Sequence, residues 1–525
     1  MEAGDYLIRV GSDSRQTKTA AVVRLDADAV VERLANELAP DHELDVLMPP
    51  TRPRESVDAP VLELWAGDCV TVDSACAIPR TIVTWAPEGR ELPEFAKGEN
   101  YQIPFACSEE VSVVRDCPDA TLPDVKEGRV TMEEFVASLD PEVLFRIVAG
   151  AANETPYEVP VRLKEKLSPV QAPRSSGSTT ALFVSSLGIP NCYMTDGPAG
   201  LHLMGCATTS YPVGMVMAQT WDPDICCLIG EGIGKEMDYY RHSVILGPGM
   251  NIHRDPLCGR NFEYYSEDPL LTGKMAAAVT KGVQSIPGKY VSVKHFACNN
   301  QEADRTLMNS TVSERALREI YLKGFEICVR EAQPGTVMTS YNKLNGIHTS
   351  SHYELLTEVL RGEWGFKGLV MTDWGTQSTK PFDLHAGNDL IMGGCRSQFL
   401  KAALYGEEPV FEADGAVREE TFEVYGGFFK ENVAMWNAFE PSADGPDTAC
   451  AQVAPGASVS AKVKELEEKG IASVRENGDG SHTVVYRGTD RGSYLALGDL
   501  QRCAAHVLRG LMNSSAYEDM MKIKG

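Results

Sequence analysis

The chain has 525 residues, 43% of them hydrophobic, which is enough for a large globular core with additions. Its 49 basic and 74 acidic residues give a net charge of −25, which argues against nucleic acids and anionic membranes as partners, because both bind positive surfaces. The sequence contains no long apolar run, leader pattern or phosphate-binding glycine loop, and its 14 cysteines lack paired or metal-binding spacing. It therefore predicts a cytoplasmic protein with reduced thiols, no metal and no cofactor.

The first part of the chain contains few regular patterns. Residues 36–120 are rich in proline and charge, and short extended runs such as 61–65 predict a wrapping or linker segment with a few strands. A helical pattern follows over residues 130–148. Residues 165–180 contain several prolines and serines and predict a loop.

From residue 190 onward, short apolar runs alternate with helical patterns, and polar residues close each run. Alternating strands and helices imply a parallel sheet, and α/β barrels place their chemistry at the carboxyl ends of the strands. Asp373 is therefore a catalytic candidate, although an acid after a strand is often only a cap or turn residue. The runs are 192–195 before Asp196, 244–246 before 247–252, 291–293 before Lys294 and His295, 336–340 before Tyr341, and 368–371 before Asp373.

Two of the intervening helices have start signals. Thr311 and Glu314, and likewise Ser351 and Glu354, have the spacing of a capping box, and apolar residues recur at helical intervals behind each pair. The second helix is expected to end near Gly362. These signals predict structure and do not indicate a substrate.

Beyond residue 395 the strand and helix signals become sparse. Residues 411–454 are irregular, and residues 462–469 form a charged helical stretch. The Asn-Gly-Asp-Gly run at 477–480 lies between two extended segments, 471–474 and 483–486, which predicts a hairpin. A closing helix is expected over 497–511.

Five short motifs in chain order resemble the signature series of glycoside hydrolase family 3, in its β-glucosidase-like branch. Each is weak alone, but five in order are specific. They cover residues 120–395 well and the ends only loosely. The resemblance implies an α/β, TIM-like (β/α) barrel over residues 121–525, with an irregular insertion at about 396–490 in a divergent C-terminal segment. The motifs are DGPAG at 196–200, GRNFE at 259–263, KHFA at 294–297, NNQE at 299–302 and TDW at 372–374.

The resemblance also implies roles for single residues. Asp373 matches the family nucleophile, which attacks the anomeric carbon of the sugar and forms a covalent glycosyl-enzyme. The substrate-binding residues that it implies, which would hold the hydroxyl groups or wall the pocket, are Asp196, Arg260, Lys294, His295, Tyr341 and Trp374.

Each of these residues also has a structural interpretation. Asp196 before Gly-Pro is typical of an Asx turn, and Arg260 has Glu263 nearby as an ion-pair partner. Lys294 and His295 are neighbours on a strand and point in different directions, so one of them is open to a structural role. Tyr341 and Trp374 are equally suited to packing. For Glu302 and Arg305 we expect a salt bridge that braces a loop.

The chain departs from the family pattern at the acid/base. In the family this glutamate usually comes from a separate α/β sandwich domain, which we do not identify here. Residues 1–35 resemble the last strands of a fibronectin type III-like domain, as in relatives with permuted domain order. A lone strand pair buries no core of its own, so this segment is expected to pack on the barrel, to pair with another chain or to lack order.

The sequence therefore predicts a retaining glycosidase that removes terminal β-linked glucose-type residues from small glycosides or oligosaccharides. Three alternatives stay open. A partner chain supplies the sandwich domain, the chain binds sugar without catalysis, or the activity is that of a β-xylosidase or arabinofuranosidase. A homo-oligomer is also open.

Overall fold

The computed structural model describes residues 1–13, 15–45, 57–74, 78, 80–92, 107–152, 175–203, 206–306, 308–393, 400, 403–405, 440–441, 448–453, 472–476, 478, 480, 482–487 and 495–524. The helix expected at 462–469, most of the loop expected at 165–180 and most of the irregular stretch expected at 411–454 lie outside these residues.

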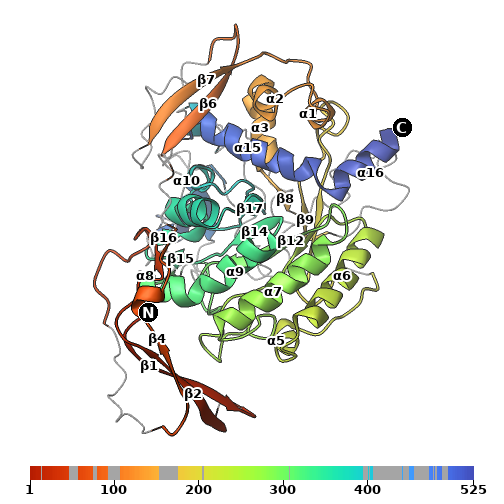
Figure 1. Ribbon diagram of the computed structural model, residues 1–525. Helices are drawn as coiled ribbons and strands as arrows, with labels where there is room; N and C mark the ends of the chain where they lie inside the picture. The colour runs from red at the N-terminus through yellow and green to blue at the C-terminus, as the bar shows by residue number, and fades with distance from the viewer. Residues whose placement is uncertain are drawn as a thin grey trace.

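A curled sheet of seven short strands forms the centre of the molecule (Figure 1). Its neighbours are parallel from β10 to β17, whereas β9 runs antiparallel to both β8 and β10. The strands, in order across the sheet, are β17 (Leu369–Met371), β14 (Thr336–Thr339), β12 (Tyr290–Phe296), β11 (Val244–Leu246), β10 (Tyr193–Asp196), β9 (Gly177–Ser178) and β8 (Ala151–Ala152).

Two isolated bridges extend this sheet beyond β17. Met371 pairs with Leu390, and Ile391 pairs with Ala149, both in parallel orientation. Because Ala149 lies two residues before β8, the backbone pairing returns to the opposite edge of the sheet, as closure into a barrel requires. The parallel sheet expected from the alternating pattern is confirmed, with β9 as an antiparallel member that the sequence did not indicate.

The strands bury both faces because they alternate between two cores. Ile245 of β11 packs in one hydrophobic cluster together with residues of the outer helices, while its neighbours Val244 and Leu246 pack in another with residues of α3 and α15. A strand buried on both faces is apolar throughout, which is why the sequence shows continuous apolar runs here.

Helices pack against the sheet (Figure 1). Two long ones, α6 and α7, begin with the same device: Asp222 and Asp268 accept backbone N–H groups at the N-cap, and proline follows at the first helical position. The helices are η1 (Ala66–Asp68), α1 (Leu122–Lys126), α2 (Met132–Ser138), α3 (Pro141–Val148), α5 (Gly214–Ala218), α6 (Pro223–Tyr239), α7 (Pro269–Gln284), α8 (Glu314–Ala316), η3 (Leu317–Tyr321), α9 (Lys323–Ala332), η4 (Thr349–Ser351), η5 (Glu354–Glu363), α10 (Lys380–Ala386), α15 (Leu497–Met512) and α16 (Ser515–Lys524).

Smaller β elements lie outside the central sheet. The N-terminal ones form a three-stranded sheet in the order β1-β2-β4, a pair β3-β5 and a ribbon β6-β7. Three strands alone do not establish a fibronectin type III-like domain. These elements are β1 (Gly4–Gly11), β2 (Thr17–Leu25), β3 (Glu32–Arg33), β4 (Val61–Leu64), β5 (Val72–Asp73), β6 (Thr81–Pro87), β7 (Ser108–Val114), β13 (Asn309–Ser310), β15 (Lys343–Leu344), β16 (Ile347–His348), β18 (Glu440–Pro441), β19 (Thr448–Val453), β20 (Ala472–Glu476) and β21 (His482–Arg487).

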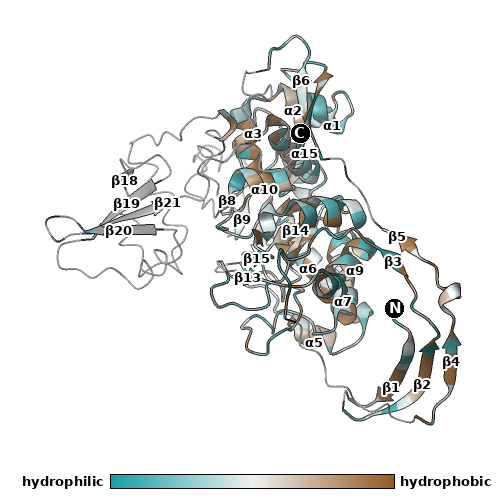
Figure 2. Ribbon diagram, turned by 90° about the vertical axis from the view of Figure 1, so that its left-hand side faces the viewer, coloured by the Kyte–Doolittle hydropathy of each residue, from teal (hydrophilic) through white to brown (hydrophobic). Residues whose placement is uncertain are grey.

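The N-terminal sheet stands at one end of the molecule, and its strands carry apolar residues that face solvent (Figure 2). The chain between β2 and β4 is tied to the barrel at α8 and η3. The Glu314 carboxylate accepts the backbone N–H of Leu38 at 2.8 Å, and the Arg318 side chain donates to the Ala35 carbonyl at 3.1 Å. Leu38 itself is buried in the core.

Several predicted boundaries are wrong for local reasons. The pattern over 130–148 forms two helices, because Asp140 caps a new helix whose first residue is Pro141. Neither predicted capping box forms as expected. Ser313, not Thr311, is the N-cap of α8, and Ser351 donates instead to the buried carboxylate of Asp383 at 2.6 Å.

Two C-terminal predictions are confirmed. β20 and β21 pair antiparallel around the Asn-Gly-Asp-Gly run, and α15 occupies the position of the closing helix. β19 lies within the stretch expected to be irregular. In the part of the chain that the structure describes, every helix is too short or too polar to cross a bilayer.

Candidate active site

Asp373 lies directly beyond the carboxyl end of β17, and its neighbours fix its side chain. The residue is 9% exposed. One carboxylate oxygen, Oδ1, accepts the backbone N–H of Trp374 at 2.7 Å, and the carboxyl group also forms a side-chain hydrogen bond with Tyr341, which follows β14. Two adjacent strands therefore deliver the acid and an aromatic hydroxyl to one place, as parallel strand ends should.

The next strand, β12, contributes Lys294 and His295. The Nε2 atom of His295 lies 3.7 Å from Oδ2 of Asp373. Asn251 clasps the His295 backbone: its Oδ1 accepts the His295 N–H at 2.8 Å, and its Nδ2 donates to the His295 carbonyl at 2.9 Å. The peptide bond between Lys294 and His295 is cis. Both side chains are almost fully buried.

Burial and charge set the protonation states here. Burial raises the pKa of Asp373 above its usual value, and the positive charges of Lys294 and Arg260 partly oppose that shift. Burial also lowers the pKa of His295 well below its usual value, and the cations Arg260, Lys294 and Arg305 lower it further. The site therefore favours a neutral imidazole beside the acid at neutral pH.

Arg260 has more acidic partners than the other cations near Asp373. It forms an ion pair with Glu263, lies 3.9 Å from Oε1 of Glu302, and stands 5.9 Å above the ring of Tyr264. The structural ion pair considered for Arg260 and Glu263 is therefore present. This ion pair is compatible with ligand binding, because part of a guanidinium remains available after one pair forms. The ligand-binding role of Arg260 stays a prediction.

Glu302 and Arg305 form the loop-bracing salt bridge that was expected, with 2.8 Å between Arg305 Nη1 and Glu302 Oε2. The Arg305 guanidinium also lies 4.7 Å from the centre of the Tyr341 ring. Tyr341 is consequently held by a cation at its ring and by the acid at its hydroxyl, which fixes the hydroxyl in place.

Asp196 ends β10 at the same edge of the sheet, with β11, β12 and β14 between it and β17. It is exposed, and its backbone is fixed at both ends: the N–H donates to Ser176 Oγ at 2.9 Å and the carbonyl accepts the His202 N–H at 2.9 Å. Trp374 is half-buried against the core cluster that includes α15. The substrate roles of Asp196 and Trp374 stay predictions.

The structure adds residues that sequence reasoning missed. Tyr264 is fully buried and its hydroxyl lies 3.2 Å from Nδ1 of His295. Asn299 donates to the same hydroxyl at 3.3 Å, and Asn251 holds the His295 backbone. All three lie in or directly beside motifs already singled out, but only their contacts reveal that they converge on His295.

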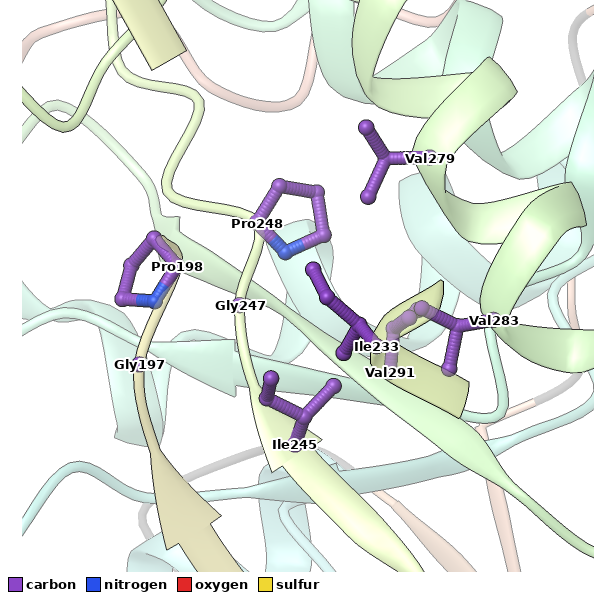
Figure 3. A pocket seen from close by; sticks show the side chains of 9 residues that line it. All are labelled: Gly197, Pro198, Ile233, Ile245, Gly247, Pro248, Val279, Val283 and Val291. Atoms are coloured by element: carbon purple, nitrogen blue, oxygen red, sulfur yellow. The ribbon is translucent and has the colours of Figure 1, made fainter. Parts of the chain in front are cut away.

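A small apolar pocket lies behind the ends of β10 and β11 (Figure 3). Valine and isoleucine side chains from α6, α7, β11 and β12 line it, together with Gly197, Pro198, Gly247 and Pro248. Its free volume of about 10 Å³ barely admits one water molecule. It is a packing gap in the core and is too small and too apolar for a sugar.

Among the residues that the structure describes, no group of three or more His, Cys, Asp or Glu side chains is arranged to hold a metal ion.

Comparison with known proteins gives the family. Residues 170–392 match the glycosyl hydrolase family 3 N-terminal domain. A β-glucosidase of Ruminococcus albus is 37% identical over 374 residues, which are 71% of this chain and 35% of that protein. The chain therefore contains a glycosyl hydrolase family 3 N-terminal domain and is similar to β-glucosidases. It spans about a third of the length of the curated relatives it matches.

Two solved structures share the fold. β-Glucosidase 3B of Thermotoga neapolitana, solved in complex with glucose, matches with a TM-score of 0.51 and 33% identity over 74% of this chain and 43% of that one. A β-glucosidase of Paenibacillus barengoltzii matches with a TM-score of 0.61 and 29% identity over 98% of this chain and 45% of that one. The TIM-like barrel of this family accounts for the curled sheet described above.

Proposed function

We propose that this chain carries the nucleophile and the sugar-binding surface of a retaining glycoside hydrolase acting on terminal β-linked glucose residues, with Asp373 as the nucleophile. The observation that carries the proposal is the buried carboxyl group of Asp373 beside Tyr341 and His295, at the carboxyl end of the barrel strands. Relatives named β-glucosidases favour glucose over the xylose or arabinose of the alternative activity.

In this mechanism the Asp373 carboxylate attacks the anomeric carbon while the bond from that carbon to the aglycone oxygen breaks. An ester between sugar and Asp373 results, and water then hydrolyses it. The attack requires an ionised carboxylate. Burial opposes ionisation of Asp373, and Lys294 and Arg260 offset part of that effect. The neutral imidazole of His295 would donate a hydrogen bond to a sugar hydroxyl.

The leaving oxygen needs a proton from a second carboxyl group about 5 Å from the nucleophile. Of the acids that the structure describes near Asp373, Glu263 is paired with Arg260 and Glu302 with Arg305. We propose that a partner polypeptide with an α/β sandwich domain supplies the acid. The aglycone of an aryl glycoside leaves as a stable phenolate and needs little protonation. Such substrates should therefore react with this chain alone.

The test uses a 2-deoxy-2-fluoro aryl β-glucoside, which traps the glycosyl-enzyme. We expect stoichiometric labelling of the wild-type chain on the peptide that contains Asp373, read by mass spectrometry, and none in Asp373→Asn, because an amide oxygen does not form the ester. Asp196→Asn should keep labelling at saturation but need several-fold more reagent, since Asp196 would contribute binding.

A remote substitution of the same kind, Asp41→Asn on the exposed N-terminal segment, serves as the control and should label like the wild type. Equal labelling of Asp373→Asn and wild type would refute the nucleophile assignment.

A second measurement separates the partner-dependent enzyme from the binding protein. With a nitrophenyl β-glucoside, a burst of nitrophenol followed by slow release indicates a nucleophile that lacks its acid/base. Azide should then speed up turnover, because it attacks the intermediate without base assistance. Absence of a burst, with glucose still raising the unfolding temperature, would favour a chain that binds sugar only.

A further inference from the structure

A buried chain of polar groups runs behind His295, away from Asp373. Tyr264 is fully buried, with its hydroxyl 3.2 Å from Nδ1 of His295. The amide nitrogen of Asn299 lies 3.3 Å from the same hydroxyl and 3.0 Å from Oε1 of Glu302. Glu302 in turn accepts from Arg305 at 2.8 Å. Buried groups of this kind are held in defined hydrogen-bond directions.

The direction of each hydrogen bond follows from Glu302, the acidic residue at the end of this chain of polar groups. Two cations hold Glu302, Arg305 directly and Arg260 at 3.9 Å, so its ionised carboxylate only accepts hydrogen bonds. The Asn299 atom that faces Glu302 must therefore be the amide nitrogen. A flipped amide would set its carbonyl oxygen against the carboxylate oxygen, which is repulsive.

The same nitrogen also faces Tyr264, so the phenolic oxygen accepts its second N–H. Burial raises the pKa of Tyr264, and the phenol keeps its hydrogen. In the described contacts, Nδ1 of His295 is the acceptor within reach of that hydrogen. Because a buried phenol donates its hydrogen where an acceptor is present, Nδ1 is the unprotonated ring nitrogen. The one proton of the neutral imidazole consequently lies on Nε2, the atom 3.7 Å from Oδ2 of Asp373.

We propose that Tyr264 is a positioning residue that fixes His295 as the Nε2–H tautomer and so keeps an N–H donor beside the Asp373 carboxylate. This distance is longer than a hydrogen bond, so the N–H remains available to a ligand that reaches Asp373. The catalytic consequence rests on the proposed function, whereas the tautomer itself does not. Tyr264 would act only through His295, since a fully buried hydroxyl bonded to Asn299 and His295 has no route to substrate.

The test is nitrogen NMR of the chain with ¹⁵N-labelled histidine, in which two-bond couplings distinguish the two tautomers. The His295 signal is assigned by its loss in His295→Gln. We expect the wild type to show the Nε2–H pattern alone between pH 6 and 8. Tyr264→Phe removes the donor to Nδ1 and should give a mixture with Nδ1–H. Tyr265→Phe, a neighbouring buried tyrosine in the hydrophobic core, is the matched control and should leave the signal unchanged.

Labelling by the fluoroglucoside gives the second readout. Tyr264→Phe should lower the maximal labelling rate about tenfold, the effect of one lost hydrogen bond, with little change in the reagent concentration for half-maximal rate. A wild-type His295 in the Nδ1–H form, or an unchanged pure Nε2–H signal in Tyr264→Phe, would overturn the proposal. If the wild type is not labelled at all, the proposed function fails, and the NMR result still decides the role of Tyr264.

Discussion

Lys294 and Asp373 carry opposite charges in a buried site, and the lysine lowers the pKa of the acid against the effect of burial. Desolvation alone disfavours a carboxylate, and the lysine acts against that penalty without forming a direct ion pair in the described contacts. His295 experiences the reverse effect, since burial and three neighbouring cations disfavour its charged form. The same positive charges therefore favour the ionised form of the acid, against burial, and the neutral form of the imidazole.

This balance predicts the pH dependence of Lys294→Met. Removing the positive charge should raise the pKa of Asp373 further, because the charge that now lowers it is lost. In a plot of labelling rate against pH, the acidic limb should then move to higher pH, since only the ionised carboxylate attacks. The measurement is the labelling rate against pH. In Lys274→Met, where the lost cation pairs with Glu331 on an outer helix, the limb should stay in place. A limb that stays fixed in Lys294→Met would contradict this account.

The helices around the barrel pack closely because glycines lie where they cross. A methyl group on Gly282 of α7 would overlap the carbonyl oxygen of Cys227 on α6, and one on Gly230 of α6 would overlap the carbonyl oxygen of Val279 on α7. Both clashes are with backbone atoms, which cannot rotate away as a side chain can. The two glycines thus set the distance between α6 and α7. This distance in turn affects where β11 and β12 lie.

Gly282→Ala should therefore destabilise the protein by about 1–3 kcal/mol, the usual cost of overpacking a core. The control is Gly510→Ala in α15, where an added methyl group meets nothing within 4 Å. There the better helix propensity of alanine should stabilise the fold by about 0.5–1 kcal/mol. Urea unfolding of both variants gives the comparison. Equal effects at the two positions would mean that the close crossing does not determine stability.

In the N-terminal sheet, unlike in the barrel, large apolar residues of the strands are exposed to solvent. Tyr6 and Ile8 of β1 are 43% and 48% exposed, and Leu62 of β4 is 58% exposed. β1 is also an edge strand of eight residues, which pairs with β2 in the part of the chain that the structure describes. Long apolar edge strands pair readily with other chains. The sheet is thus suited to contact another polypeptide, in line with the proposed partner.

Replacing Ile8 by lysine should weaken such contacts without affecting the barrel. We expect Ile8→Lys to reduce self-association of the isolated chain in sedimentation velocity, because a charge on an edge strand opposes strand pairing. Its unfolding free energy should change by no more than about 0.5 kcal/mol, as for other surface substitutions. Leu228→Lys, at a 63% exposed position on α6, is the matched control. Equal self-association of both variants would argue against a role for the sheet edge.

Much of the central fold could be predicted because its signals are local. The strands β11, β14 and β17 begin and end within one residue of the predicted apolar runs, since buried parallel strands are apolar throughout. The Asn-Gly-Asp-Gly turn likewise specified the hairpin of β20 and β21. The capping box expected at Ser351 did not form, because this side chain donates to the buried carboxylate of Asp383 in α10.

The sequence by itself determined the family, the order of strands and helices, and the placement of Asp373, Lys294 and His295 at strand ends, because these depend on patterns along the chain. Only the tertiary structure decided that Tyr264, Asn299 and Glu302 form a hydrogen-bonded chain of polar groups behind His295. It also decided that Arg260 lies near two glutamates. Hydrogen-bond direction and pKa depend on burial and on neighbours from distant loops, which no local pattern specifies.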